Sequence, residues 1–162
     1  MIQRVWADRF TTNILPHKFE AGTPNIADVI AFGAAVDYLS AVGLPAIGRH
    51  ERELVGRALD VLRAESHVEV YGPADIAARG GVVSFNVGNI HPHDVGQVFD
   101  SEGVEVRVGH HCCQPLMRAL GISGTVRASF YLYNTLDEVE AFARGLRKTK
   151  SFFKVGAREA KV

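Results

Sequence analysis

The residues best suited to chemistry gather in one stretch, VRVGHHCCQPLMRALG, residues 106–121. It holds both cysteines of the chain, Cys112 and Cys113, directly after the histidines His110 and His111. Four explanations fit such a stretch: a metal site, a disulfide, a reactive thiol, or two small buried residues beside two surface imidazoles. The spacing and surroundings of these four side chains separate the explanations.

A metal site and a disulfide both conflict with the spacing. Zinc ligands are usually spaced so that two side chains converge on one ion, whereas adjacent residues in extended chain point to opposite faces. His91 and His93 could add ligands, but nothing in the sequence brings them to this stretch. A disulfide between neighbouring cysteines closes a very small, distorted ring, and a reducing compartment disfavours it. We therefore expect neither a metal ion nor a disulfide here.

The two remaining explanations stay open on local chemistry. A reactive thiol needs an electropositive, partly exposed loop that favours the thiolate. The stretch supplies such a setting through Arg107, the two histidines and the possible start of a short helix at Pro115. Burial as a small hydrophobe is the commonest fate of a free cysteine. Only the surroundings in the folded chain distinguish these two outcomes.

Two arginines and one turn could bind anions. Arg107 precedes the cysteines and Arg127 follows them, each within an otherwise apolar strand. A guanidinium binds a carboxylate through two parallel hydrogen bonds, so two arginines flanking a thiol could hold an amino acid. The alternative is a solvated strand face with surface salt bridges. The turn EAGTPN, residues 20–25, could hold a phosphate on its backbone donors or could simply begin a helix.

The hydrophobic pattern predicts the elements that position these residues. Residues 1–22 show no clear period and predict irregular chain. A helix with one apolar face is expected after its cap at Thr23, and a second from about residue 46 to 64. Strands are predicted at 67–72, 80–88, 104–108 and 126–133, and helices at 92–102 and from 135 onward. This order favours an α+β domain, a mixed or antiparallel sheet with helices on one face.

The same pattern predicts which side chains are buried. In the strands, we expect Val83, Phe85 and Val87 on one face, and Arg107 on the face opposite Val106. The last helix begins with a capping box from Thr135 to Glu138. The predicted apolar stripes of the second and last helices are Ile47, Leu54, Val55, Ala58, Leu59 and Leu62, and Leu136, Val139, Phe142, Ala143 and Leu146.

Composition limits the possible partners and the compartment. A chain of 162 residues fits one compact domain. Eighteen basic residues balance eighteen acidic ones, which argues against binding nucleic acid or a membrane surface through bulk charge. No apolar run approaches the roughly 18 residues of a membrane helix, and the first residues lack the apolar core of a secretory signal. Two adjacent cysteines form no disulfide framework, so we expect a cytoplasmic protein.

Three segments, taken together and in order, resemble a known family. They are FEAGTPNIADVIAFGAAVDYL, HPHDVGQVFDSEGVEVRVGHHCCQPLMRALG and TVRASFYLYNTLDEVEAFARGL. They resemble the C-terminal part of the SUF-type cysteine desulfurases, fold-type I pyridoxal-phosphate enzymes of the class V aminotransferase group. The resemblance covers about residues 1 to 153. It implies the family's small α+β domain at 65–153, preceded by two bridging helices at 25–64 and an irregular remnant of the large domain at 1–24, and followed by a disordered tail at 154–162.

The resemblance also implies a reaction and its residues. These enzymes convert L-cysteine to L-alanine and an enzyme-bound persulfide, with pyridoxal phosphate as the electron sink. The persulfide then passes to a sulfur-acceptor protein of the SUF system for iron–sulfur cluster assembly. Cys112 matches the family's nucleophile, Arg127 the arginine that holds the substrate carboxylate, and Arg107 a second active-site arginine. Gly22 and Thr23 match a turn that reaches the cofactor phosphate of the other subunit of a dimer.

The sequence departs from the family in two ways. The residue after the nucleophile is often alanine, and Cys113 is expected to be a passive substitute for it. The family's Schiff-base lysine, ring-stacking histidine and pyridine-facing aspartate have no matching motif, since Lys18 aligns with a variable linker. We therefore expect a truncated, split or separately expressed part that is inactive alone and needs a missing N-terminal half or a homodimer partner. The alternative is a non-catalytic persulfide carrier or interaction module.

Overall fold

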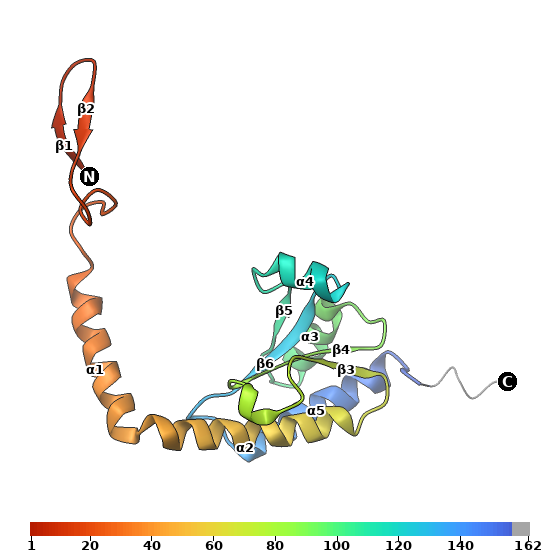
Figure 1. Ribbon diagram of the computed structural model, residues 1–162. Helices are drawn as coiled ribbons and strands as arrows, with labels where there is room; N and C mark the ends of the chain where they lie inside the picture. The colour runs from red at the N-terminus through yellow and green to blue at the C-terminus, as the bar shows by residue number, and fades with distance from the viewer. Residues whose placement is uncertain (157–162) are drawn as a thin grey trace. The chain divides into compact units, whose positions relative to one another are not determined.

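The computed structural model describes residues 1–156, and the chain divides into two compact units, Met1–Leu44 and Pro45–Val162. The first unit contains an antiparallel hairpin of β1, Ile2–Val5, and β2, Phe10–Thr12, followed by helix α1, Ile26–Val42 (Figure 1). The prediction of irregular chain at residues 1–22 is therefore wrong. The pattern missed the hairpin because both strands are short and expose every residue, so they lack an alternation of apolar and polar positions.

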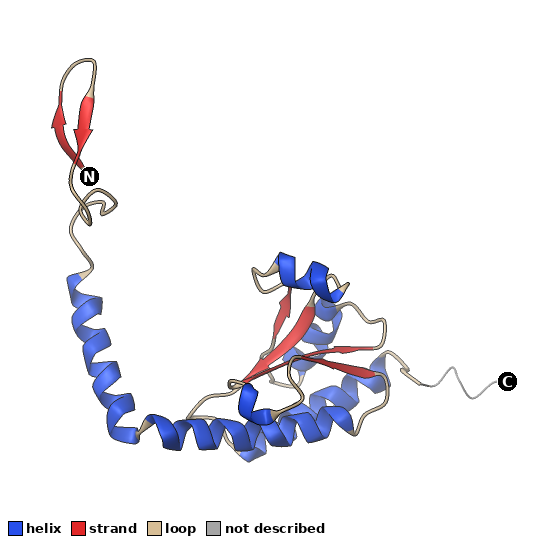
Figure 2. Cartoon of the chain, in the orientation of Figure 1, coloured by secondary structure: helices blue, strands red, loops and turns tan. Residues whose placement is uncertain are grey.

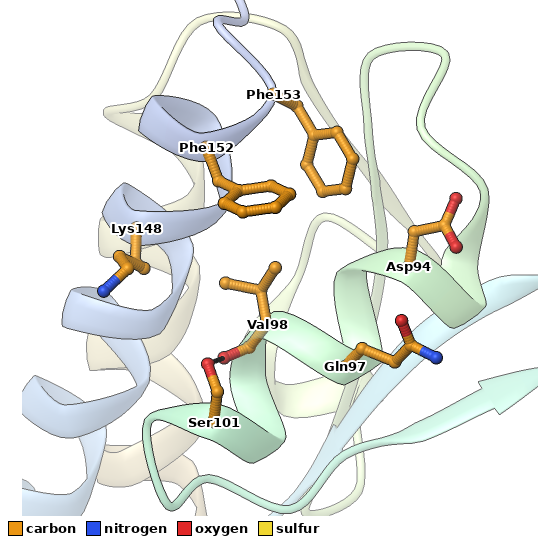
Figure 3. Close-up of a pocket in the computed structure, with 7 residues that line it drawn as sticks. All are labelled: Asp94, Gln97, Val98, Ser101, Lys148, Phe152 and Phe153. Atoms are coloured by element: carbon orange, nitrogen blue, oxygen red, sulfur yellow. Dashed lines mark hydrogen bonds between the residues drawn. The ribbon is translucent and has the colours of Figure 1, made fainter.

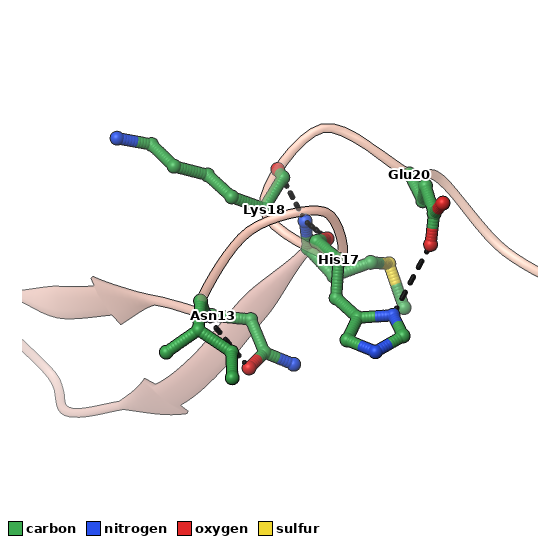
Figure 4. A network of polar contacts seen from close by, with 6 residues as sticks. Asn13, His17, Lys18 and Glu20 are labelled. Atoms are coloured by element: carbon green, nitrogen blue, oxygen red, sulfur yellow. Dashed lines mark hydrogen bonds and ion pairs between the residues drawn. The ribbon is translucent and has the colours of Figure 1, made fainter.

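Polar contacts of the backbone fold residues 13–20 back onto the start of the chain. The amino group of Met1 donates to the carbonyl oxygens of His17 and Lys18, each at 2.6 Å. His17 also pairs with Glu20, with Nδ1 and Oε2 3.1 Å apart (Figure 4). These contacts close the base of the hairpin.

Helix α1 exposes apolar side chains all round. None of its residues is buried within the structure, so the predicted single apolar face is not observed. Its cap is Asn25, whose side chain accepts the N–H of Asp28 at 3.4 Å. The prediction of a cap at Thr23 is therefore wrong. A helix that is hydrophobic all round is normally buried, and this unit does not bury it.

The second unit is built on a four-stranded antiparallel sheet in the order β3-β4-β6-β5 (Figure 2). The strands are β3, Val68–Tyr71, β4, Val82–Val87, β5, Arg107–Gly109, and β6, Thr125–Ser129. One face is covered by helices α2, Leu44–Arg63, α3, Pro92–Ser101, and α5, Leu136–Phe152. The short helix α4, Gln114–Leu120, follows β5, and a 3-10 turn at Ile76–Ala78 joins β3 to β4. The predicted α+β class is confirmed.

The core lies between the sheet and these helices, largely where the sequence predicted it. Val83, Phe85 and Val87 of β4 are fully buried. The Phe142 ring of α5 meets Phe85 edge-on, with centroids 5.5 Å apart. The predicted stripe of α2 is buried at all six positions: Ile47, Leu54, Val55, Ala58, Leu59 and Leu62. Because α2 supplies so much of this core, it belongs to the second unit rather than with α1 as a pair of bridging helices.

Other differences arise at element ends. The first residue of α5, Leu136, is 46% exposed, so its predicted place in the core is wrong. The strand predicted at 104–108 pairs only over β5, although Val104, Val106 and Val108 still pack against the core. The strand predicted at 126–133 stops at Ser129, because Asn134 turns the chain by accepting the N–H of Tyr131 at 2.8 Å.

Two expectations concern the chain end and the membrane. The tail predicted at 154–162 lies mostly outside the described residues, and within them Val155 packs against the core.

In the described part of the chain, no single helix is long and apolar enough to span a membrane. Helices α1 and α2 together, as a bent pair, satisfy that test by length and composition alone.

Candidate active site

The face of the sheet opposite the core carries a row of polar residues across three strands. Arg107 of β5 pairs with Arg127 of β6, and Arg127 pairs with Ser84 of β4 on its other side. Residues that pair directly in antiparallel strands project from the same face. The two predicted arginines are therefore neighbours on one surface, although 20 positions separate them in the sequence (127 − 107 = 20).

This arginine pair lacks a negative partner. Within residues 1–156 neither Arg107 nor Arg127 takes part in an ion pair, and the buried Nε of Arg127 has no hydrogen-bond partner. Like charges directly opposite each other destabilise a sheet. The alternative of a strand face with surface salt bridges therefore does not describe this site. Two unpaired guanidinium groups side by side fit a bound anion such as a carboxylate.

The loop between β5 and α4 presents both cysteines. His111 and Cys112 have φ angles of 53° and 56°, which are uncommon for residues other than glycine. The N–H of Cys113 donates to the carbonyl of His110 at 2.8 Å, and the N–H of Cys112 donates to Nδ1 of the same histidine at 3.2 Å. Both thiols are free and exposed, so the explanation of two buried small residues is wrong for this chain.

His111 connects this loop to the arginine face. Its Nε2 lies 2.8 Å from Oγ1 of Thr125, a buried residue of β6. Burial, and then the positive charges of Arg127 and Arg107, lower the pKa of His111 below its ordinary value. The imidazole is therefore neutral at neutral pH. Sequence reasoning missed this role, because the hydrogen bond between His111 and Thr125 is a tertiary contact that no sequence pattern indicates.

An open pocket of about 490 Å³ lies against the same face. Its polar side includes His111, Thr125 and Arg127, and Cys113 also lines it. Cys112 is not among the residues that line it. Helix α4 supplies an apolar wall through Leu116, Met117 and Leu120. The pocket therefore combines a thiol, a guanidinium and apolar surface, the components needed to hold a small amino acid.

A second pocket lies between α3 and α5 and lacks these components. Figure 3 shows Phe152 and Phe153 over Val98, with Asp94 and Lys148 among the lining residues. No cysteine, histidine or arginine is among the described residues that line it. Among the described residues, no group of three or more histidine, cysteine, aspartate or glutamate side chains could hold a metal ion.

The predicted phosphate turn belongs to the first unit, whereas the other predicted site residues belong to the second. Gly22 and Thr23 are exposed, and Gly22 has a φ of 83°, which favours glycine. In the described part of the chain, the N–H groups of these two residues donate no hydrogen bond. Free backbone donors just before helix α1 fit a phosphate group, with the carboxylate of Asp28 in the first turn as an opposing charge.

The comparisons with known proteins identify the family of this chain. The family model described as Aminotransferase class-V matches residues 1–142. A probable cysteine desulfurase of Halalkalibacterium halodurans is 52% identical over 139 residues, which cover 86% of this chain and 34% of the relative. A probable cysteine desulfurase of Streptomyces coelicolor is 46% identical over 153 residues, which cover 94% of this chain and 37% of the relative.

Solved structures give the same result. The apo structure of a cysteine desulfurase from Thermococcus onnurineus superposes with a TM-score of 0.76 at 46% identity, covering 91% of this chain and 36% of that one. The cysteine desulfurase CsdA from Escherichia coli gives 0.79 at 32% identity, covering 94% and 37%. The chain thus spans about a third of the length of the relatives it matches. It belongs to the class-V aminotransferase family, and its relatives within that family include cysteine desulfurases.

Proposed function

We propose that this chain is the thiol-bearing, carboxylate-binding part of a cysteine desulfurase, the C-terminal part of the complete enzyme. The observation that carries this proposal is the arginine pair on β5 and β6, which has no negative partner among residues 1–156 and is followed by an exposed cysteine loop. An amino acid with a thiol meets both requirements at once. Its carboxylate pairs with a guanidinium, and its sulfur lies within reach of a protein thiolate.

Each residue has a separate task in this reaction. Arg127 binds the substrate carboxylate, Arg107 adds a second positive charge, and the neutral His111 adds none. The sulfur of Cys112, as thiolate, forms an S–S bond with the sulfur of substrate cysteine while the substrate C–S bond breaks. The electron pair of that C–S bond stays on the substrate carbon, which takes up a proton, so the products are alanine and a persulfide on Cys112.

Pyridoxal phosphate, when bound, supplies the electron sink for this chemistry. In this proposal Gly22 and Thr23 hold the cofactor phosphate of the other subunit through their free N–H groups. The lysine that carries the cofactor comes from the remaining two thirds of the enzyme, and no lysine is among the described residues that line the pocket with Arg127. Without that part the chain is inactive alone.

The wider setting follows from the same proposal. The complete enzyme works as a dimer in the cytoplasm and passes its persulfide to a SUF acceptor protein for iron–sulfur cluster assembly. The exposed apolar surface of α1 supports the need for a further partner, because monomeric proteins rarely leave large apolar patches uncovered. Among its exposed apolar side chains are Ile26, Val29, Ile30, Phe32 and Val36.

Reconstitution tests this proposal. The chain is coexpressed with the complementary two thirds of the Streptomyces coelicolor relative, and the purified pair is supplied with L-cysteine, pyridoxal phosphate and a thiol reductant. Alanine and sulfide should form in equal amounts. Cys112→Ala should abolish both products, whereas the matched variant Cys113→Ala should retain them. A copurified, cofactor-bound pair that releases no alanine would contradict the proposal.

A persulfide carrier is the second candidate, favoured by the exposure of both thiols in this chain without any further part. It requires neither cofactor nor arginine pair. The isolated chain, treated with glutathione persulfide, should then gain one sulfur on Cys112 and release it to a second thiol protein. If the Arg127→Ala chain still transfers sulfur to the second thiol protein as well as the wild type does, a carrier function would be favoured over a role as part of the enzyme.

A further inference from the structure

We propose that His111 is a positioning residue that fastens the cysteine loop to strand β6. Its Nε2 lies 2.8 Å from Oγ1 of Thr125, and Thr125 pairs with Gly109, the last residue of β5. The contact therefore joins the loop to the strand pair at the point where the loop leaves the sheet. The contact links residue 111, immediately before Cys112, to residue 125, so both ends of the segment 111–125 are held together.

The backbone of the loop needs such a restraint. His111 and Cys112 are both in the left-handed region, where residues other than glycine persist only when surrounding contacts hold them. In the described residues, the N–H groups of Cys112 and Cys113 both bond to His110, inside the loop itself. The bond from His111 reaches the sheet instead, so it can set the position of the whole loop.

The surroundings keep the imidazole neutral. The charged groups that act on it are Arg127 on β6, Arg107 on β5 and His110 in the loop, and all three oppose its protonation, as does burial. A hydrogen bond with the backbone of Thr125 acts in the other direction but has a smaller effect on the pKa than burial and the two arginines. Because the folded protein lowers the pKa of His111 below 6.5, the ring is neutral above that pH. As the pH falls further, protonation adds a charge that the arginines repel, and this repulsion weakens the fastening.

The two ring nitrogens have different tasks. Nδ1 is buried and has no hydrogen-bond partner among the described residues. A lone pair at that position is favoured by the field of the neighbouring arginines, whereas a proton there would be both repelled and unpaired. We therefore assign the ring proton to Nε2, which donates it to Oγ1 of Thr125. Protonation of Nδ1 would place a third positive charge beside Arg107 and Arg127.

The consequence for catalysis rests on the proposed function, but the fastening itself does not. A fixed loop holds Cys112 in one orientation, and orientation of a nucleophile contributes strongly to its effective concentration. His111 is not a reacting group in this account. It acts through the position of its neighbour.

Amide hydrogen exchange in the full chain tests the fastening directly. The amide of Cys113 reports on the loop, and the amide of Phe85 in the core reports on the fold. At pH 7.5, His111→Ala and Thr125→Val should each reduce the protection of Cys113 about fivefold, as expected for one lost hydrogen bond, and the double variant should reduce it no further. His111→Gln and Thr125→Ser, which keep a donor and an acceptor, should preserve protection.

The pH dependence distinguishes positioning by a neutral ring from simple packing. Protection of the Cys113 amide in the wild type should fall as the pH is lowered below 6.5. His111→Gln should lose less protection over the same range, and this difference separates the effect of His111 from that of His110. The exposed His17→Gln in the first unit is the matched control and should behave as the wild type.

Three results would overturn the inference: unchanged protection in both His111→Ala and Thr125→Val, additive losses in the double variant, or equal pH dependence in the wild type and His111→Gln. Thr125→Val and Thr125→Ser decide the matter if His111→Ala fails to fold. Cys112→Ala should leave the protection of the Cys113 amide unchanged. If instead the reconstituted pair with the wild-type chain is inactive although its loop is fastened, that result would contradict the proposed function alone.

Discussion

Arg107 and Arg127 lie directly opposite each other in the β5–β6 ladder, on the face of the sheet opposite helices α2, α3 and α5. Their like charges oppose each other in the free chain, and in the proposed function the two guanidinium groups share the negative charge of the substrate carboxylate. The pair therefore couples the stability of the sheet to the binding of a negative ligand. The stability of variants at these positions therefore tests the site without a measurement of enzyme activity.

Replacing one arginine of the pair should stabilise the free chain while weakening anion binding. Arg107→Gln removes a like charge opposite Arg127, so the free energy of unfolding should rise by roughly 0.2–1 kcal/mol at low salt and change less at high salt. Urea denaturation measures the first effect, and titration with L-cysteine sulfinate measures the second. Arg118→Gln on α4 is the control, since Arg118 lies outside this ladder. Equal stability of Arg107→Gln and the wild type at low salt would argue against repulsion.

Gly124→Ala should loosen the strand pair that carries both arginines. A Cβ at Gly124 would lie 2.9 Å from the carbonyl carbon and oxygen of Gly109, which is backbone and cannot rotate away. The loss of unfolding free energy should be about 1–3 kcal/mol, as for other overpacked positions. Gly80→Ala, where a Cβ would meet nothing within 4 Å, should change stability little. Thermal unfolding of the two variants compares them, and similar values would disprove the close contact.

Phe142 should be essential to the core, in contrast to Phe152 on the same helix. The Phe142 ring packs on Phe85 and on Phe99, with centroids 5.5 and 5.3 Å away, so Phe142→Ala should cost about 3–5 kcal/mol. Phe152 is 66% exposed, and Phe152→Ala should cost much less. Chemical denaturation gives both values. A loss for Phe152→Ala as large as that for Phe142→Ala would mean that its exposure in the structure is wrong.

The start of α5 should contribute a pH-dependent stability. Glu138 accepts the N–H of Thr135 at 2.7 Å, and this bond, followed by that from Asn134, lowers the pKa of its carboxyl group. A carboxyl pKa below its ordinary value means that the contribution is present above pH 4.5 and is lost as the pH falls. Glu138→Gln should therefore reduce stability at pH 7 more than at pH 3. A variant effect that is the same at both pH values would exclude this contribution.

Local patterns predicted much of the second unit correctly. The stripe of α2, the buried face of β4 and the box that begins α5 depend on residues within a few positions of one another, and the period of the side chains encodes them directly. The hairpin of β1 and β2 and the exposed α1 lack such a signal, since neither buries a face within its own unit. The strand predicted at 104–108 is longer than its paired part, because alternation in the sequence does not indicate where the hydrogen bonds between two strands end.

The sequence by itself determined the residue types of the site: two cysteines in a loop, an arginine on each side, and a glycine-containing turn before a helix. It did not determine that Arg107 and Arg127 oppose each other, that His111 reaches Thr125, or that Cys113 shares a pocket with Arg127. The roles of Cys112, Gly22 and Thr23 stay predictions. Strand register, loop conformation and burial arise from contacts between distant parts of the chain, so only the tertiary structure decided how these side chains meet.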